Sequence, residues 1–216
     1  MNKNIAAEHG WDRAYVENAE APLWSQEPMP ILEDVLDRAR GCCLDLGCGD
    51  GRNLVALQQG GLDVVGLDIS MTALRRADRL LRARGRAAPL ILGDILSLPF
   101  ADHTIDTVTA LDVLGQVSDL APVLAEVRRV LKEDGLLAAN LFDLSDSTFG
   151  EGSPVSGNTF LYKDTLFRYF SRREVHDLFA GWQTEVTRAS WTDPPHGDFR
   201  PRKHMHVNHI VFARPS

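Results

Sequence analysis

Short apolar runs alternate with segments of helical spacing between Cys42 and Phe142, and this alternation limits the possible folds more than any other feature. The runs with the length of buried strands are CCLDL, DVVGLD, PLILGD, TIDTVTALD and GLLAANLF. Helical spacing is found over 52–59, 71–84 and 120–132. Strands that are joined through helices run parallel, with right-handed crossovers. The sequence therefore predicts an α/β fold with a core of five parallel strands.

Residues 143–170 break this alternation. They are rich in Ser, Gly, Thr and Asp, which predicts a lid-like loop. A short helix then begins at a capping box formed by Ser171 and Glu174. Two strand patterns follow over 183–191 and 205–213, with no helix between them. Because such consecutive strands pair antiparallel, we expect a hairpin at the edge of the sheet.

The 216 residues, 44% of them hydrophobic, are enough to bury a full core without disulfides or metal. We predict a single doubly wound Rossmann-like domain with a mostly parallel seven-stranded sheet and a C-terminal antiparallel hairpin. Its predicted parts are a lead-in or cap over 1–40, a cofactor-binding core over 42–142, the lid-like loop over 143–170, and the C-terminal helix and hairpin over 171–216. The lead-in is expected to be irregular or partly helical, with helical spacing over 31–39.

The composition disfavours several classes of protein. A net charge of -7 disfavours a nucleic-acid partner held by phosphate contacts, and the Arg-rich stretch over 75–86 is typical of a solvated helix face. Three clustered cysteines form neither a secreted disulfide framework nor a CxxC pair. No apolar run approaches the roughly 18 residues of a membrane span, and the first residues lack a signal-peptide pattern. We expect a cytoplasmic monomer or homodimer that binds a small molecule, and neither nucleic acid nor a membrane.

A glycine-rich loop, DLGCGDG, connects the first strand to the first helix. Its glycines, Gly47, Gly49 and Gly51, let a ligand approach the backbone and the positive end of the helix dipole. No Gly-Lys-Ser/Thr follows, and the spacing is not GxGxxG, so neither a P-loop nor a dinucleotide loop is predicted. Asp45 and Asp50 would repel phosphate. A cofactor with an amine and a sulfonium suits these carboxylates better.

Two further acids end the next strands of the predicted sheet. Asp68 ends the second strand, where a carboxylate can accept both hydroxyls of a ribose. Asp94 ends the third, where it can accept from the amine of an adenine while Ile95 packs on the ring. The alternative without a ligand-binding role is a doubly wound domain whose glycines only turn the chain. That alternative requires three independent features to coincide.

The segments CLDLGCGDGRN, VVGLDIS, GDILSLPF and VLKEDGLLAANLF resemble the successive motifs of class I S-adenosylmethionine-dependent methyltransferases. The resemblance covers about residues 42–142. It implies that the loop glycines pass under the cofactor, S-adenosyl-L-methionine, and that Asp45 serves its amino-acid end. It also implies that Asp68 binds the ribose and that Asp94 and Ile95 bind the adenine. With Trp24, which is considered below, the expected cofactor-binding residues are Asp45, Gly47, Gly49, Gly51, Asn53, Asp68, Ile69, Asp94, Ile95 and Leu111.

A narrower resemblance lies outside the core. The segments WDRAY, PLWSQEPMP and FSRREVHDLFAGW resemble the tellurite-resistance and thiopurine-type small-molecule methyltransferases. We therefore expect an enzyme that methylates an O, N or S/Se/Te nucleophile of a small molecule. Two alternatives stay open at this point. One is a non-catalytic S-adenosylmethionine-binding sensor or interaction protein, and the other is an NAD-dependent oxidoreductase, which Asp50 and the glycine spacing disfavour.

Histidines are concentrated in the tail, at His196, His204, His206 and His209. On a strand, His204 and His206 share one face. Three interpretations compete: packed or solvated histidines, a substrate-binding or general-base role with His196 assisting, and a metal site completed by His196 or Asp198. Because no recognised ligand spacing is present, we predict no metal. His204, His206 and His196 are named as candidate catalytic residues.

Three other residues are candidates for the acceptor side. Asp112 and Gln116 follow the fourth strand, where acceptor-facing residues lie in this fold, and Asp112 is the fourth candidate catalytic residue. A helix-capping Asp and a surface Gln are equally good interpretations. Trp24 can place its ring face against a sulfonium or the substrate. A core or hinge tryptophan is the alternative.

Overall fold

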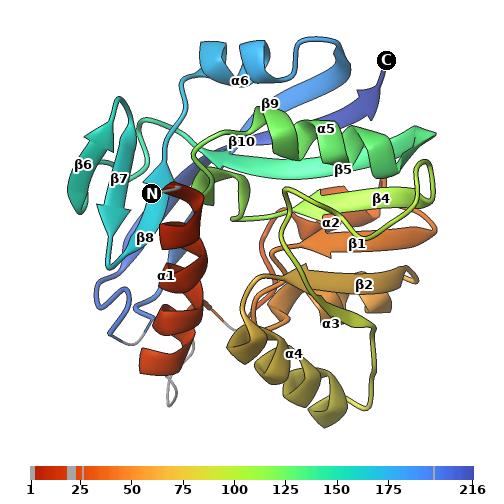
Figure 1. Ribbon diagram of the computed structural model, residues 1–216, viewed down its shortest axis with the longest axis horizontal. Helices are drawn as coiled ribbons and strands as arrows, with labels where there is room; N and C mark the ends of the chain where they lie inside the picture. Colours follow the sequence, from red (N-terminus) through yellow and green to blue (C-terminus); the bar gives the residue numbers. More distant parts are fainter. Residues whose placement is uncertain (1–2, 19–22, 26, 197) are drawn as a thin grey trace.

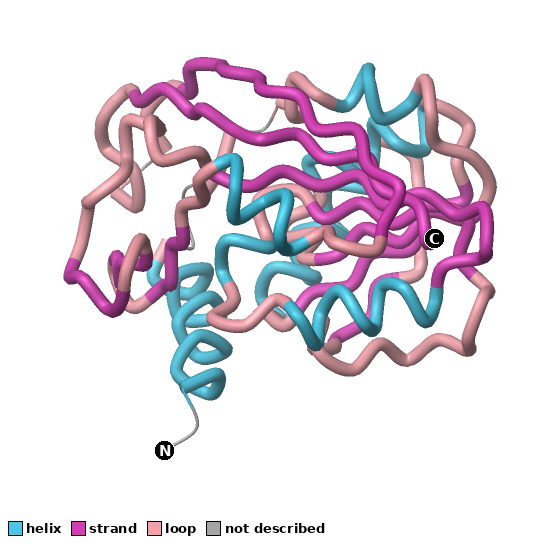
Figure 2. The backbone as a smooth tube through the Cα atoms, turned by 90° about the horizontal axis from the view of Figure 1, so that it is seen from above, coloured by secondary structure: helices cyan, strands magenta, loops and turns pink. Residues whose placement is uncertain are grey.

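The computed structural model describes residues 3–18, 23–25, 27–196 and 198–216. Seven strands form one sheet in the order β3-β2-β1-β4-β5-β10-β9 (Figures 1 and 2). Their bounds are β1 (Cys42–Leu46), β2 (Asp63–Asp68), β3 (Leu90–Leu92), β4 (Ile105–Ala110), β5 (Leu131–Phe142), β9 (Trp182–Asp193) and β10 (His204–Pro215). The first five pair parallel, whereas β10 is antiparallel to both β5 and β9. The predicted Rossmann-like α/β fold with a terminal hairpin is confirmed.

Helices cover both faces of the sheet (Figure 1). They are α1 (Lys3–Glu17), α2 (Leu32–Leu36), α3 (Arg52–Gln59), α4 (Met71–Ala83), the 3-10 turn η1 (Leu114–Gln116), α5 (Ala121–Val130) and α6 (Arg172–Leu178). Alternate residues of β1 divide the core: Cys43 packs with α2, α3 and α4, whereas Leu44 and Leu46 pack with α5 and α6. None of the helices in the described ranges is long and apolar enough to cross a membrane.

Two of the predicted helix starts are confirmed by their capping bonds. The Ser70 hydroxyl accepts a hydrogen bond from the Ala73 N–H (3.1 Å) and begins α4. Ser171 and Glu174 form the reciprocal bonds of a capping box at the start of α6. The helix predicted over 31–39 is shorter in the structure, where α2 begins at Leu32 and ends at Leu36.

The prediction of a lid-like loop over 143–170 is wrong. This segment contains a small antiparallel sheet of three strands, β6 (Ser153–Ser156), β7 (Thr159–Tyr162) and β8 (Thr165–Arg168). Lys163 and Asp164 both have positive φ (48° and 62°), as a two-residue hairpin turn requires. Gly157, also at positive φ, lies in the other turn. The Ser, Gly and Asp residues that predicted a loop therefore mark tight turns between short strands.

The lead-in is helical over α1 and packs against α4 and β8 (Figure 1). Arg76 of α4 donates hydrogen bonds to the carbonyls of Tyr15 and Asn18, which holds the end of α1. An aromatic cluster joins α1 to the small sheet and the tail. Its members with ring centroids 5.7–6.2 Å from a neighbour are Trp11, Trp24, Tyr162, Phe167 and Phe199. Helix α1 and Trp24, the small sheet, and Phe199 in the segment between β9 and β10 thus form one cap over the core.

We expect Phe167→Ala to lower the free energy of unfolding by about 3 kcal/mol, because a fully buried aromatic side chain is removed from the centre of this cap. Denaturant unfolding measures the loss. The matched control is Phe149→Ala, since Phe149 is 41% exposed and should cost less than half as much. Equal losses in the two variants would contradict the cap as a packed unit.

Candidate functional site

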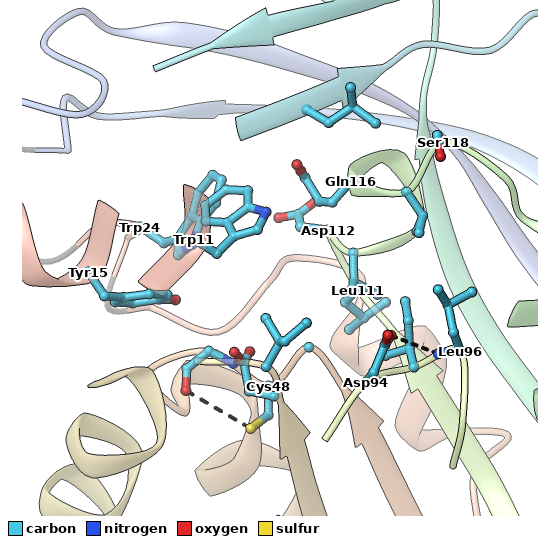
Figure 3. Close-up of a pocket in the computed structure, with 18 of the residues that line it drawn as sticks. Trp11, Tyr15, Trp24, Cys48, Asp94, Leu96, Leu111, Asp112, Gln116 and Ser118 are labelled. Atoms are coloured by element: carbon cyan, nitrogen blue, oxygen red, sulfur yellow. Dashed lines mark hydrogen bonds between the residues drawn. The ribbon is translucent and has the colours of Figure 1, made fainter. Parts of the chain in front are cut away.

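A cavity of about 410 Å³ opens where the parallel strands end, between the core and the cap. Its volume is in the range of small-molecule sites, and its position is where ligands bind in open α/β sheets. Figure 3 shows Trp11, Tyr15 and Trp24 along one side, with Asp112 and Gln116 beside the tryptophans. The predicted residues that line the cavity are Trp24, Gly47, Gly49, Asn53, Asp68, Ile69, Asp94, Ile95, Leu111, Asp112 and Gln116.

The glycine loop forms the floor of this cavity. Gly47 and Gly49 have φ of +64° and +56°, a left-handed conformation that side chains strain. A Cβ at Gly47 would lie 2.6 Å from Val113 Cγ2, and one at Gly49 would lie 2.6 Å from the Tyr15 hydroxyl. Gly51 is the N-cap of α3 and does not line the cavity. The loop therefore leaves a bare backbone surface beside a helix N-terminus, which is the local arrangement that a close ligand needs.

Asp68 is held rigidly at the end of β2. Its Oδ2 accepts from the Gly49 N–H (2.8 Å) and its Oδ1 from the Ser70 N–H (2.8 Å). Burial raises the pKa of Asp68 to about 6, although the two backbone donors act in the opposite direction. Each oxygen keeps a second lone pair. The carboxylate is thus a fixed double acceptor in the cavity wall.

Asp45, on β1 beneath the loop, does not line the cavity. Its Oδ1 accepts from the Thr109 hydroxyl (2.6 Å), whereas its Oδ2 is buried with no hydrogen-bond partner among the described residues. Burial raises the pKa of Asp45 to about 7. An acid whose buried oxygen is unsatisfied is destabilising when ionised, so this site favours a proton or a cation at Asp45.

Asp94 and Ile95 follow β3 and line the cavity with Leu96, in the region where Figure 3 places Leu111. The Asp94 Oδ1 accepts from the Leu96 N–H (2.9 Å), which fixes the carboxylate in a tight turn. Apolar side chains therefore flank an oriented acid. This arrangement can bind a flat ring that carries a hydrogen-bond donor on its edge.

Asp112 lies beside the tryptophans in the cavity wall (Figure 3). It has a positive φ (57°), and its backbone N–H and side chain both bond to the Asn140 amide. The carboxylate forms an ion pair of 2.6 Å with Arg52, and both side chains are about 90% buried. Asp112 is therefore not a helix cap. Its charge is matched by Arg52, a lining residue that the sequence analysis did not name although it directly follows Gly51.

Gln116 is buried in η1 and not on the surface. Neither its amide nitrogen nor its amide oxygen has a hydrogen-bond partner among the described residues, and the side chain lines the cavity. Trp11 and Tyr15 of α1 also line it. Their role was missed because nothing in a lead-in sequence indicates which side chains fold back over the core.

The structure does not place His196, His204 or His206 in the cavity wall. They form a buried group beyond Trp24, whose ring centroid lies 6.4 Å from that of His196. His204 and His206 do share a face, with their Nε2 atoms 3.1 Å apart. His209 points away and bonds to Asp143 (2.8 Å). None of these imidazoles is in a position to contact a ligand in the cavity directly.

Comparison with known proteins gives a family match over the core of the sheet. Residues 44–139 match the family model described as a methyltransferase domain. A demethylmenaquinone methyltransferase from Corynebacterium kroppenstedtii is 39% identical over 94 residues, which cover 44% of this chain and 38% of that protein. A malonyl-[acyl-carrier protein] O-methyltransferase from Pseudescherichia vulneris is 27% identical over 172 residues, covering 77% of this chain and 67% of that protein. The chain thus spans less than half the length of the first of these relatives.

The fold has solved counterparts. A SAM-dependent methyltransferase structure from Methanosarcina mazei superposes with a TM-score of 0.71 at 21% identity, covering 88% of this chain and 99% of that one. This likeness includes the strands outside the matched family model, so the C-terminal hairpin belongs to the shared fold. The relatives do not single out the tellurite-resistance or thiopurine-type group.

We expect Asp45→Asn to remove a pH dependence of stability. The pKa of Asp45 is about 7 in the folded protein, whereas an ordinary Asp in an unfolded chain has a pKa of 3.8. Because the folded state binds the proton more tightly, the free energy of unfolding falls as pH rises between about 4 and 7. The contribution is at most about 1.4 kcal/mol per pH unit. Urea unfolding at pH 5 and pH 8 measures it. The wild type should lose more stability than the variant over this interval, and parallel curves would refute the assignment.

Proposed function

We propose that this chain, whose residues 44–139 form a class I S-adenosylmethionine-dependent methyltransferase domain, methylates a small molecule bound under its cap. The observation that carries the proposal is the Asp68 carboxylate, held between the Gly49 and Ser70 N–H groups in the wall of the cavity. A fixed double acceptor beside a bare glycine loop suits the ribose of a nucleoside cofactor. The cytoplasm is the compartment that we expect for this reaction.

The charge of the cavity favours a cationic nucleoside over a polyanionic one. Its described lining includes the acids Asp50, Asp68, Asp94 and Asp112, against one basic residue, Arg52. The Arg52 charge is already matched by Asp112. Such a lining attracts the ammonium and sulfonium groups of S-adenosylmethionine and repels a pyrophosphate.

The residues that would hold the cofactor follow from these contacts. Asp68 would accept from the ribose hydroxyls, and Asp94 would accept from the adenine amine between apolar neighbours. Asp45 does not line the cavity, so its carboxylate would act on the ammonium of the amino-acid end only through its charge, from beneath the glycine loop. The bound cofactor supplies an electrophilic methyl group. The chain's own contribution is to orient this group and to exclude water by means of the cap.

The acceptor would lie between the tryptophans and Gln116. This part of the cavity has aromatic and aliphatic walls, from Trp11, Trp24, Val155 and Leu161. The unpartnered Gln116 amide is the polar group that would orient the acceptor. Since no imidazole is described in the cavity wall and Asp112 is engaged by Arg52, a nucleophile that arrives already ionised suits the site best. A thiolate or another chalcogen anion meets this requirement, because the sulfonium of the bound cofactor would attract it where the acidic lining does not. This choice agrees with the tellurite-resistance and thiopurine-type resemblance.

Methyl transfer is tested by incubating the protein with methyl-labelled S-adenosylmethionine and a panel of thiols, selenols, phenols and carboxylates. Label in a thiol or selenol product supports the proposal. Tight binding of S-adenosylhomocysteine with no labelled product anywhere would favour a non-catalytic binding protein. Calorimetry that shows binding of NAD and not of S-adenosylhomocysteine would refute the proposed cofactor.

We predict that binding of S-adenosylhomocysteine requires ionised Asp68. Because burial raises the pKa of this carboxyl to about 6, the affinity should be constant above about pH 7 and should fall by up to tenfold per pH unit below about pH 6. Asp68→Asn should bind about 10- to 100-fold more weakly at pH 8 and lose this dependence. Calorimetric titration from pH 5 to pH 8 tests both points. Asp78→Asn, at an exposed position on α4, is the control and should match the wild type.

We also predict opposite effects of Gln116→Met on stability and on acceptor binding. The substitution removes two buried, unpartnered amide atoms, so the unliganded protein should gain about 1 kcal/mol of stability. The KM for the acceptor should rise by about tenfold, since one hydrogen bond to the substrate is lost. Thermal unfolding and steady-state kinetics measure the two effects. A variant with unchanged KM would show that Gln116 does not contact the acceptor.

A further inference from the structure

Behind the acceptor side of the cavity, the end of the β9–β10 hairpin gathers two histidines and an acid. His204 and His206 of β10 and Asp193 of β9 are all at least 91% buried. One potential ligand atom from each residue lies within 4.8 Å of the other two. The strand pairing explains the grouping, because His204 is directly opposite Asp193 and His206 is two residues further along the same face.

The second ring nitrogen of each histidine is already engaged. His204 Nδ1 lies 2.9 Å from the Arg202 carbonyl oxygen, and His206 Nδ1 lies 3.0 Å from Asp146 Oδ2. Both partners are acceptors, so each Nδ1 donates. In a neutral imidazole this leaves Nε2 as a bare lone pair. The structure therefore brings two lone pairs within 3.1 Å of each other on rings that meet at 86°, which requires a positive species beside them.

The spacing fits a metal ion. Two nitrogen ligands at 2.0–2.1 Å from a tetrahedral zinc ion lie about 3.3 Å apart, close to the observed separation of the Nε2 atoms. Asp193 Oδ2 lies 3.9 Å from His206 Nε2 and supplies a third ligand of the right type. Asp146 repeats the carboxylate–histidine pairing that orients metal-bound imidazoles.

An additional buried group points to the same place. His196 is 3% exposed, and its Nε2 has no hydrogen-bond partner among the described residues. This atom lies 3.5 Å from Asp193 Oδ2. His196 therefore lies next to Asp193, outside the set of ligand atoms that are all within 4.8 Å of one another.

We propose that His204, His206 and Asp193 bind a divalent first-row transition-metal ion such as Zn²⁺. Asp193 takes the place of Asp198, which the sequence offered as a partner. The site connects the hairpin to the segment that follows β5 through Asp146. Because Trp24 contacts His196 and lines the cavity, an ion here would stiffen the wall that faces the acceptor.

A proton is the competing positive species. Its carrier would be His206, whose pKa is raised by the Asp146 carboxylate against the effect of its own burial. The His206 imidazolium would then donate from Nε2 to His204. Zn²⁺ and this proton exclude one another, so a direct measurement of metal binding separates the two states.

The experiment uses the full chain without a histidine tag, treated with a chelator and titrated with Zn²⁺ by calorimetry at pH 7.5. We expect one equivalent to bind tightly. The double variant His204→Gln/His206→Gln removes two ligands, so its affinity for Zn²⁺ should fall by more than about 100-fold. Asp146→Asn removes only the hydrogen-bond partner of a ligand, so its affinity for Zn²⁺ should fall by about 10- to 100-fold. His176→Gln, at an exposed position on α6, is the matched control and should match the wild type.

X-ray absorption of the zinc-loaded wild type provides a measurement that does not depend on how the variants fold. Nitrogen and oxygen ligands with an imidazole pattern are expected. A wild type that binds no stoichiometric zinc overturns the proposal, as does undiminished binding in a folded double histidine variant. Sulfur ligands, which would come from the cysteines at positions 42, 43 and 48, overturn it as well.

Discussion

The Asp68 carboxylate joins three elements of the core. It accepts one N–H from the glycine loop after β1 and another from Ser70, the N-cap of α4, while it ends β2 itself. Both N–H groups need an acceptor oxygen, and the Asp68 carboxylate provides one to each in a buried position. The same burial raises the pKa of Asp68. The strand ends, the loop and the helix start are therefore positioned by the same group that faces the ligand.

The cap solves a different problem, which is how to exclude water from a cavity on an open sheet edge. Helix α1, the small sheet and the segment between β9 and β10 meet through tilted and edge-on aromatic rings. Two of these rings, Trp11 and Trp24, also form part of the cavity wall. Packing of the cap and closure of the site are thus the same interaction. Buried polar groups, which begin at Asp112 in the wall and continue behind it through Asn140 to the histidines of β10, extend this boundary into the C-terminal hairpin.

The core and most of the cofactor side could be predicted from the sequence, because local signals carry them. The strand and helix alternation, the loop glycines and the Ser70 and Ser171 caps are short-range features. The segment over 143–170 could not be predicted correctly, because composition does not distinguish a loop from short strands joined by tight turns. Arg52, Trp11 and Tyr15 were missed because their place in the wall depends on partners at least 60 positions distant in sequence or on another element.

By itself, the sequence determined the order of strands and helices over residues 42–142 and the set of acids that follow successive strand ends. These acids meet because parallel strands bring their carboxyl ends to one edge of the sheet. The tertiary structure alone decided what each polar side chain does there. It paired Asp112 with Arg52, buried Gln116 without a partner, and withdrew His204 and His206 from the cavity to face Asp193. These outcomes depend on which distant side chains share a desolvated space, and no spacing along the chain encodes that.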